Sequence, residues 1–132
     1  MNIDSQKIKV ETRAENCYDF LSRPENYERL MPESIKKFEL NDRGGFLFQL
    51  NGMPEISLKL DQKTPYTKVV WGSANEKFAF KLWAEITEIS TEQTQVQWRF
   101  QGDFNAMISM MAKKPLGRFI ETLSSNLQAK TF

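Results

Sequence analysis

The hydrophobic pattern changes its period twice along the chain, and this limits the fold more than any other feature. From residue 34 to 104 apolar and polar side chains alternate, most clearly over 46–50, 56–60, 78–86 and 96–104. Such alternation is typical of half-buried antiparallel strands. Turn-forming sequences separate these stretches at 41–45, 51–52, 64–66, 73–76 and 90–92. This part of the chain therefore predicts a meander of about six strands.

Two short helices are predicted between this meander and a first strand over residues 3–11. Thr12 to Glu15 has the form of a capping box, in which a hydroxyl and a carboxylate bind free amides at a helix start. Ser22 to Glu25 repeats the pattern with Pro24 in the first turn, and Pro32 ends the second helix. The apolar faces are Ala14, Cys17, Tyr18 and Leu21 in the first helix, and Tyr27, Leu30 and Met31 in the second.

Helical spacing returns over residues 106–128, with Asn105 as the predicted N-cap. The apolar stripe of this segment is Ile108, Met111, Ala112, Phe119, Ile120, Leu123 and Leu127. A helix of this length spans roughly 35 Å, enough to cover the apolar face of the sheet. Pro115 lies inside the segment, so we expect a bend near Ala112 or two consecutive helices.

These elements together predict an α+β helix-grip fold. A curved antiparallel sheet of about seven strands wraps around a long kinked C-terminal helix, and two short helices follow the first strand. No linker, repeat or low-complexity tract divides the sequence. Residues 1–132 are therefore expected to form a single domain, a common size for one hydrophobic core.

Two segments also carry a family resemblance, the helix pair 14–21 and 27–32 and the closing segment 104–116. They resemble the START-like (SRPBCC) superfamily, in particular its bacterial branch of polyketide cyclase/dehydrase and lipid-transport-like proteins. The resemblance implies an apolar pocket under the C-terminal helix, which different members use for lipids, quinones, polyketides or plant hormones. It brings no shared catalytic motif, so it raises the expectation of ligand binding without naming a ligand.

Composition excludes several kinds of chemistry. The sequence has no histidine and one cysteine, Cys17, which excludes Ser-His-Asp and Cys-His catalysis, histidine metal sites and thiolate clusters. We therefore expect no catalytic residue, no metal and no cofactor. With 18 basic and 17 acidic side chains the net charge is +1, which supplies no long-range attraction for nucleic acid or an anionic membrane.

The expected location is the cytoplasm. The first residues lack the apolar core of a signal peptide, and a lone cysteine fits a reducing compartment. The apolar runs are shorter than the ~20 residues of a membrane span, so no stable membrane insertion is expected.

The inward side chains of the predicted sheet are apolar and rich in aromatic rings, among them Phe46, Phe78 and Phe104. Methionines at the start of the long helix add flexible side chains suited to variable apolar shapes, so we place the cavity mouth there. For each of these residues the alternative is a plain core position. The predicted ligand-binding set is Phe48, Leu58, Trp71, Phe80, Trp98, Phe100, Met107, Met110, Met111 and Phe119.

Few polar residues are candidates for chemistry. The hydroxyls of Tyr18, Tyr27 and Tyr66 are candidates for orienting a ligand. The simpler interpretation is that all three are amphipathic packing residues. Lys113 and Lys114 are candidates for contact with an anionic headgroup at the pocket mouth. The alternative is an ordinary solvated surface. Cys17 falls on a buried helix face and is predicted to be a small core residue. We predict that four charged side chains face outward from their strands: Asp61, Glu85, Arg99 and Asp103.

Three functions remain open on the sequence alone. The first is non-catalytic carriage or sensing of a hydrophobic small molecule or lipid in the apolar cavity. The second is a polyketide cyclase- or dehydratase-like enzyme, which would need a buried polar group. The third is a protein-interaction module or homodimer that uses an exposed apolar patch of Trp83 with Val70 and Ala79, residues out of phase with the inward face.

Overall fold

The computed structural model describes residues 1–74 and 79–132. The predicted inward position of Phe78 and the end of the predicted 73–76 turn lie outside these residues. The strands are β1 (Asn2–Asp4), β2 (Ile8–Val10), β3 (Lys37–Leu40), β4 (Phe46–Gln49), β5 (Ile56–Thr64), β6 (Lys68–Ser73), β7 (Phe80–Ser90) and β8 (Gln93–Gly102). The helices are α1 (Ala14–Leu21), the 3₁₀ helix η1 (Pro24–Leu30) and α2 (Ala106–Ala129).

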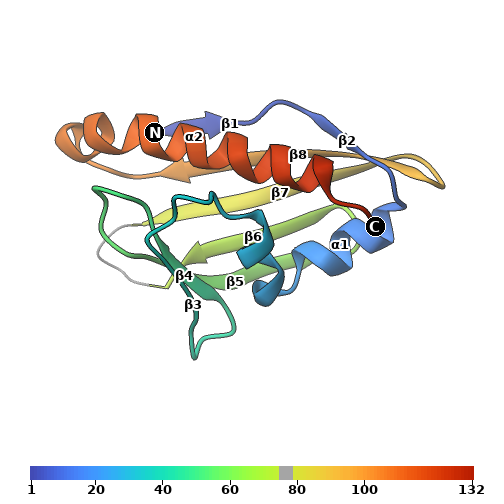
Figure 1. The fold of residues 1–132 in the computed structure, drawn as a ribbon, viewed down its shortest axis with the longest axis horizontal. Helices are drawn as coiled ribbons and strands as arrows, with labels where there is room; N and C mark the ends of the chain where they lie inside the picture. The colour runs from blue at the N-terminus through green and yellow to red at the C-terminus, as the bar shows by residue number, and fades with distance from the viewer. Residues whose placement is uncertain (75–78) are drawn as a thin grey trace.

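The strands form one curved antiparallel sheet in the order β1-β8-β7-β6-β5-β4-β3, with β2 also paired to β8 (Figure 1). The six consecutive strands β3 to β8 are the predicted meander. The first strand differs from its prediction because it is two short strands separated near Ser5. The Ser5 side chain accepts a hydrogen bond from the Trp98 amide at 2.9 Å, which keeps this break against β8. The predicted helix-grip architecture is confirmed.

Both predicted capping boxes are wrong, although the two helices themselves are present. Arg13 and Arg23 are the N-cap residues, and neither makes a side-chain capping bond. The Thr12 hydroxyl instead accepts a hydrogen bond from Asn16, while the Thr12 carbonyl accepts one from Thr94 of β8. The hydroxyl of Ser22 donates to the Tyr18 carbonyl. These hydroxyls therefore bond groups other than the backbone amides that a capping box would satisfy.

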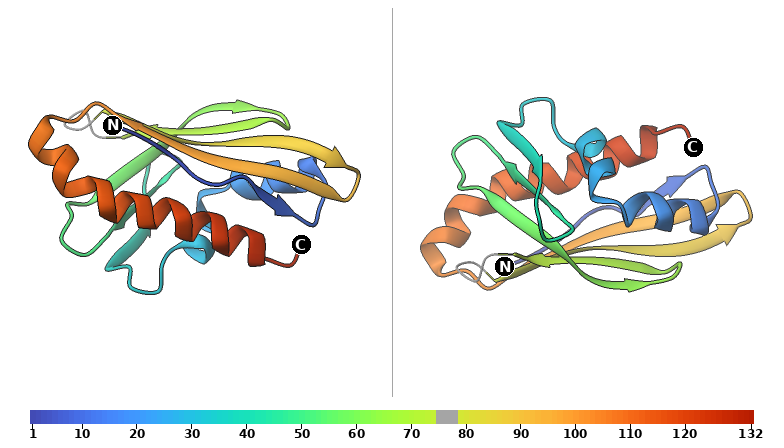
Figure 2. Two further views of the ribbon diagram at one scale, coloured as in Figure 1. Left: turned by 90° about the horizontal axis from the view of Figure 1, so that it is seen from above. Right: turned by 90° about the horizontal axis from the view of Figure 1, so that it is seen from below.

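Helix α2 crosses the concave side of the sheet (Figure 2). Asn105 is its N-cap as predicted, and the Asn105 carbonyl oxygen Oδ1 accepts the Ile108 amide at 2.9 Å. Pro115 lies inside a helix that continues from Ala106 to Ala129, so one bent helix forms instead of two. Proline has no N–H to donate to the carbonyl four residues earlier, and the first turns of α2 run in a different direction from the rest (Figure 2).

The second half of α2 fills most of the concave side. Phe119 stacks on Phe48 with ring centroids 4.4 Å apart, and both rings are buried. The short helix η1 contributes Tyr27, whose ring stacks on Phe46 and meets Trp71 edge to face. This part of the interior is a close-packed aromatic core, as expected for a folded domain. An apolar space lies toward the end where α2 begins.

Candidate ligand pocket

An apolar pocket of about 180 Å³ lies between the first half of α2 and the sheet. One wall is α2, through Ile108, Met111, Ala112 and Leu116. The opposite wall is the connection from β4 into β5, residues 53–57. The floor is formed by Phe80 of β7, Phe100 of β8 and Phe104 just before α2.

The aromatic floor is held by ring contacts. Phe80 and Phe100 stack with centroids 5.7 Å apart, and Phe104 lies 6.2 Å from Phe100. The period of β7 and β8 places Phe80 and Phe100 on the concave face, as predicted. Phe100 is buried, whereas Phe80 and Phe104 are half-buried because they border the open volume. The rings therefore present a preformed apolar surface.

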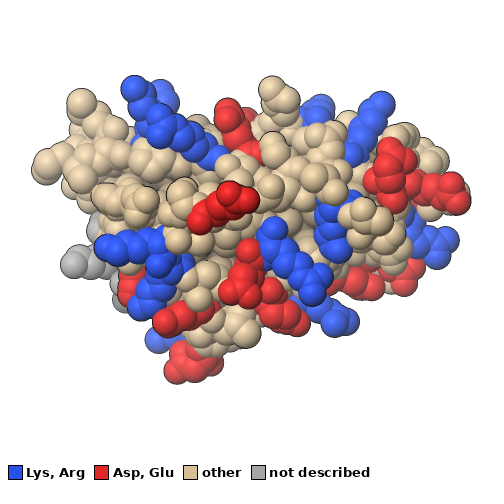
Figure 3. Space-filling model, in the orientation of Figure 1, with Lys and Arg blue, Asp and Glu red and all other residues tan. Residues whose placement is uncertain are grey.

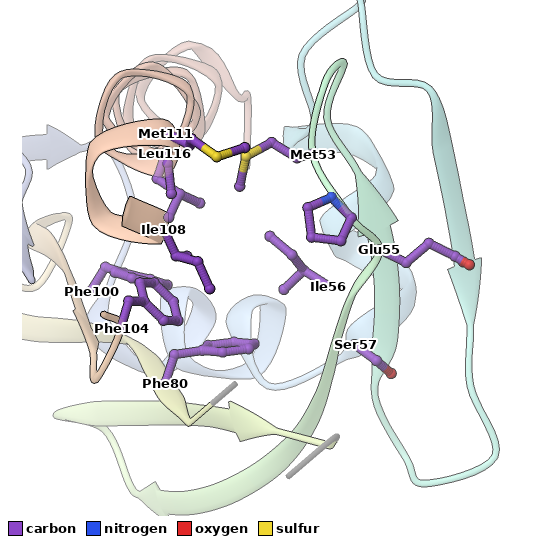
Figure 4. A pocket seen from close by; sticks show the side chains of 12 residues that line it. Met53, Glu55, Ile56, Ser57, Phe80, Phe100, Phe104, Ile108, Met111 and Leu116 are labelled. Atoms are coloured by element: carbon purple, nitrogen blue, oxygen red, sulfur yellow. The ribbon is translucent and has the colours of Figure 1, made fainter. Parts of the chain in front are cut away.

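Both walls present apolar side chains to the space. Met111 and Met53 extend from opposite walls at the rim, and Ile56 and Ile108 point into the space (Figure 4). Glu55 and Ser57 alternate with Ile56 along the strand, so their side chains point away from the pocket (Figure 4). The Glu55 carboxylate is paired with Lys37 at 3.4 Å on the outside. The interior of the pocket is thus lined by hydrocarbon and sulfur.

The predicted ligand-binding residues separate into three groups in the structure. Phe80, Phe100 and Met111 line the pocket. Met107 and Met110 are 69% and 83% exposed and do not line it, so the structure does not bring all three methionines to the cavity. The remaining five are packed in the core away from the pocket: Phe48, Leu58, Trp71, Trp98 and Phe119. A role in ligand contact stays a prediction for the first group.

Several lining residues were not in the predicted set. Ile108, Ala112 and Leu116 lie on the α2 side, and Met53 and Ile56 on the other. The helical stripe already pointed to Ile108 and Ala112, because they share a face with Met111. The helical spacing of three to four residues also places Met107 and Met110 on a different face of α2. No sequence pattern shows that the loop before β5 folds over the start of the helix.

The other polar candidates lie away from the pocket. Tyr27 is fully buried, donates to the Leu21 carbonyl at 2.7 Å and accepts the Trp71 indole N–H at 2.9 Å. Burial raises the pKa of the Tyr27 hydroxyl, against the effect of the Trp71 hydrogen bond. Tyr18 is buried on α1 and Tyr66 is exposed, with their rings edge to face at 5.4 Å. These tyrosines are packing residues rather than pocket residues.

Cys17 is inaccessible to solvent, as predicted for a core position. Burial raises the pKa of its thiol to about 11, although a hydrogen bond with Thr94 acts in the opposite direction. The thiol therefore stays protonated at neutral pH, and a protonated thiol is a poor nucleophile.

Charged residues predicted to face outward do so. Arg99 bonds Glu85 at 3.0 Å and lies 3.3 Å from Asp4, and Asp61 pairs with Lys81 at 3.4 Å. Burial alone would raise the pKa of Glu85, but hydrogen bonds from Trp83 and Arg99 and nearby positive charge lower it. This network is surface structure with no access to the pocket.

The predicted apolar patch at Trp83 is not open. Val70 is buried, and the Trp83 indole N–H donates to Glu85 at 3.1 Å. The Lys68 ammonium lies 5.6 Å from the centre of the Trp83 ring, a cation–π contact that covers the ring. Ala79 is exposed. Dimerisation through this face stays a prediction. These residues do not form a continuous apolar surface that would support it.

Among residues 1–74 and 79–132, no three His, Cys, Asp or Glu side chains gather as a metal site. In the same ranges, no helix combines the length and the apolar character that crossing a membrane requires.

Comparison with known proteins shows the fold. Neither a family model nor a curated relative matches the sequence. Among solved structures, KanY aligns with a TM-score of 0.73 at 10% identity, over 97% of this chain and 94% of KanY. A START superfamily protein from Mycobacterium smegmatis aligns at 0.65 and 14% identity, over 98% and 99%. Norcoclaurine synthase from Thalictrum flavum, solved with dopamine and hydroxybenzaldehyde, aligns at 0.66 and 12%, over 100% and 89%. The chain has the START-like helix-grip fold.

Proposed function

We propose that the chain binds an apolar small molecule in the pocket at the start of α2 and carries or senses it without chemical change. The observation that supports this most directly is the lining, in which three phenylalanine rings face aliphatic and methionine side chains. Ligand sites in proteins are mostly apolar and concave, with few polar groups that fix orientation. Here the two polar side chains of the lining point away, so shape and hydrophobic contact select the ligand.

The volume limits the size of the ligand. An engineered apolar cavity of about 150 Å³ binds benzene, so about 180 Å³ fits one or two fused rings or the end of an acyl chain. If the pocket were sealed and dry, its cost would be about 4 kcal/mol at ~24 cal/mol per Å³. A ligand that fills it removes part of this cost. The ring compounds bound to norcoclaurine synthase are of similar size and support the proposal of a ring-bearing ligand.

A catalytic role has less support. An enzyme with this fold would need a polar group with a perturbed pKa that faces the ligand. Within residues 1–74 and 79–132, those with shifted pKa, Cys17, Tyr27, Glu85 and Arg99, are all outside the lining. Carriage or sensing in the cytoplasm is therefore the function we propose.

Filling the pocket from α2 tests this function. Ala112 is buried and borders the space, so the ring of Ala112→Phe should occupy it and lower the affinity for naphthalene at least tenfold. Equilibrium dialysis with naphthalene measures the affinity, and far-UV circular dichroism checks the fold. Ala129→Phe is the matched control, because Ala129 is exposed at the other end of the same helix. Saturable naphthalene binding that is equal in the two variants would contradict the proposed site, and so would no binding by the wild type.

A further inference from the structure

Three methionines form an exposed apolar cap at the beginning of α2. Met107, Met110 and Met111, here called the methionine cap, are 69%, 83% and 60% exposed. They lie on the first turns of α2, at one extreme end of the molecule (Figures 1 and 2). In Figure 3 this end is mostly free of charged side chains on the face shown, with lysine and arginine side chains beside it. Met107 and Met110 neither line the pocket nor belong to the core, so their exposure on a projecting end marks a contact surface.

The charged side chains of the first half of α2 have one sign. Between Asp103 and Glu121 the sequence has no acidic residue, but it has Lys113, Lys114 and Arg118. Within the part of the chain that the structure describes, no carboxylate forms an ion pair with these three cations. Because the whole chain has a net charge of only +1, this positive surface is a local feature of the first half of α2.

We propose that the methionine cap docks onto an anionic lipid surface. Helices that lie on membranes combine apolar side chains, which enter the headgroup region, with lysine and arginine beside them. Each basic side chain near an anionic surface adds to the attraction, which decreases within a Debye length. A second copy of the chain fits this surface less well, because two caps that meet would bring the same positive charges together.

The pocket opens beside the methionine cap, which connects docking to ligand exchange. Met111 belongs both to the cap and to the pocket lining, so a docked cap turns the pocket mouth toward the lipid. An apolar ligand could then pass between bilayer and pocket without crossing water. This second step rests on the proposed function, whereas docking itself depends only on the cap and its charges.

Vesicle co-sedimentation of the full chain tests the docking. The wild type should bind vesicles of 70% phosphatidylcholine and 30% phosphatidylglycerol at low salt, and phosphatidylcholine vesicles at least tenfold more weakly. The double substitution Lys113→Gln and Lys114→Gln should lower binding to the anionic vesicles about 30-fold, since each lysine contributes at the surface. Met107→Ser with Met110→Ser should lower it at least tenfold, and 0.5 M NaCl should weaken the wild type.

Matched variants elsewhere on the surface serve as controls. Lys7→Gln with Lys9→Gln removes the same charge from exposed positions near β2, and Leu40→Ser with Ile89→Ser removes exposed apolar groups. Both should bind anionic vesicles as the wild type does. The proposal is overturned if these controls lose as much binding as the cap variants, or if the wild type does not bind anionic vesicles. A methionine-dependent dimer in sedimentation velocity without vesicle binding overturns it in favour of a second copy.

The proposed ligand pocket and the proposed docking surface can be tested independently. Naphthalene affinity in solution should be unchanged in the two cap variants, because Met107, Met110 and the two lysines do not line the pocket. Naphthalene binding without vesicle binding rejects only the docking. Vesicle binding without naphthalene binding rejects only the pocket.

Discussion

Replacing Gly45 with alanine is expected to lower the free energy of unfolding by about 4 kcal/mol or more, an effect large enough to unfold many domains. A Cβ at this position would overlap the Leu58 carbonyl and lie 2.9 Å from the Lys59 Cα. These are backbone atoms of β5, and Leu58 pairs with Phe46 in the adjacent register. Neither strand can move away without breaking the pairing that builds one side of the pocket.

The control for this substitution is Gly117→Ala in α2. A Cβ at Gly117 would meet nothing within 4 Å, and alanine is favoured over glycine inside a helix by about 1 kcal/mol. Urea denaturation followed by tryptophan fluorescence should show Gly45→Ala strongly destabilised and Gly117→Ala equal to or slightly above the wild type. A Gly45→Ala protein within 1 kcal/mol of the wild type would show that β4 and β5 are not as close as described.

Removing one hydroxyl from the aromatic core is the second large effect. Tyr27→Phe leaves the Leu21 carbonyl and the Trp71 indole N–H without their partner in a buried place. An unpaired buried polar group costs about 1–3 kcal/mol, so the two together should lower the free energy of unfolding by about 2–6 kcal/mol. Thermal and urea unfolding measure the loss.

Tyr66→Phe is the matched control for Tyr27→Phe. Tyr66 is 46% exposed, and phenylalanine keeps its edge-to-face contact with Tyr18. We expect a change within about 0.5 kcal/mol, as for most surface substitutions. Equal effects of the two substitutions would mean that the Tyr27 hydroxyl does not join η1 to the sheet.

The fold could be predicted from the sequence because its signals are long and periodic. The alternation over 34–104 and the stripe after Asn105 each extend over many residues, so small errors at the ends do not change the architecture. The capping boxes failed because four residues are a short pattern. The hydroxyls of Thr12 and Ser22 bond other groups four residues away, the Asn16 side-chain amide and the Tyr18 carbonyl.

The pocket was harder to predict because periodicity shows which side chains face inward but not where packing leaves space. Phe48 and Phe119 were both correctly placed inside, and they fill their part of the interior by stacking on each other. The open volume depends on the bend of α2 and on how residues 53–57 lie against it. Pro115 predicts the bend, but the position of residues 53–57 is a consequence of tertiary packing, so a strand-by-strand pattern selects core and pocket residues equally.

Methyl NMR of the six methionines tests the central claim, that an apolar ligand enters the space between α2 and residues 53–57. Naphthalene is titrated into protein labelled with ¹³C at the methionine methyl groups, and ring currents of the bound rings shift nearby methyl signals. We expect saturable shifts at Met53 and Met111, which line the pocket, and none at Met31, which is buried in the core elsewhere. Unchanged Met53 and Met111 signals, or a largest shift at Met31, would contradict ligand binding at this site.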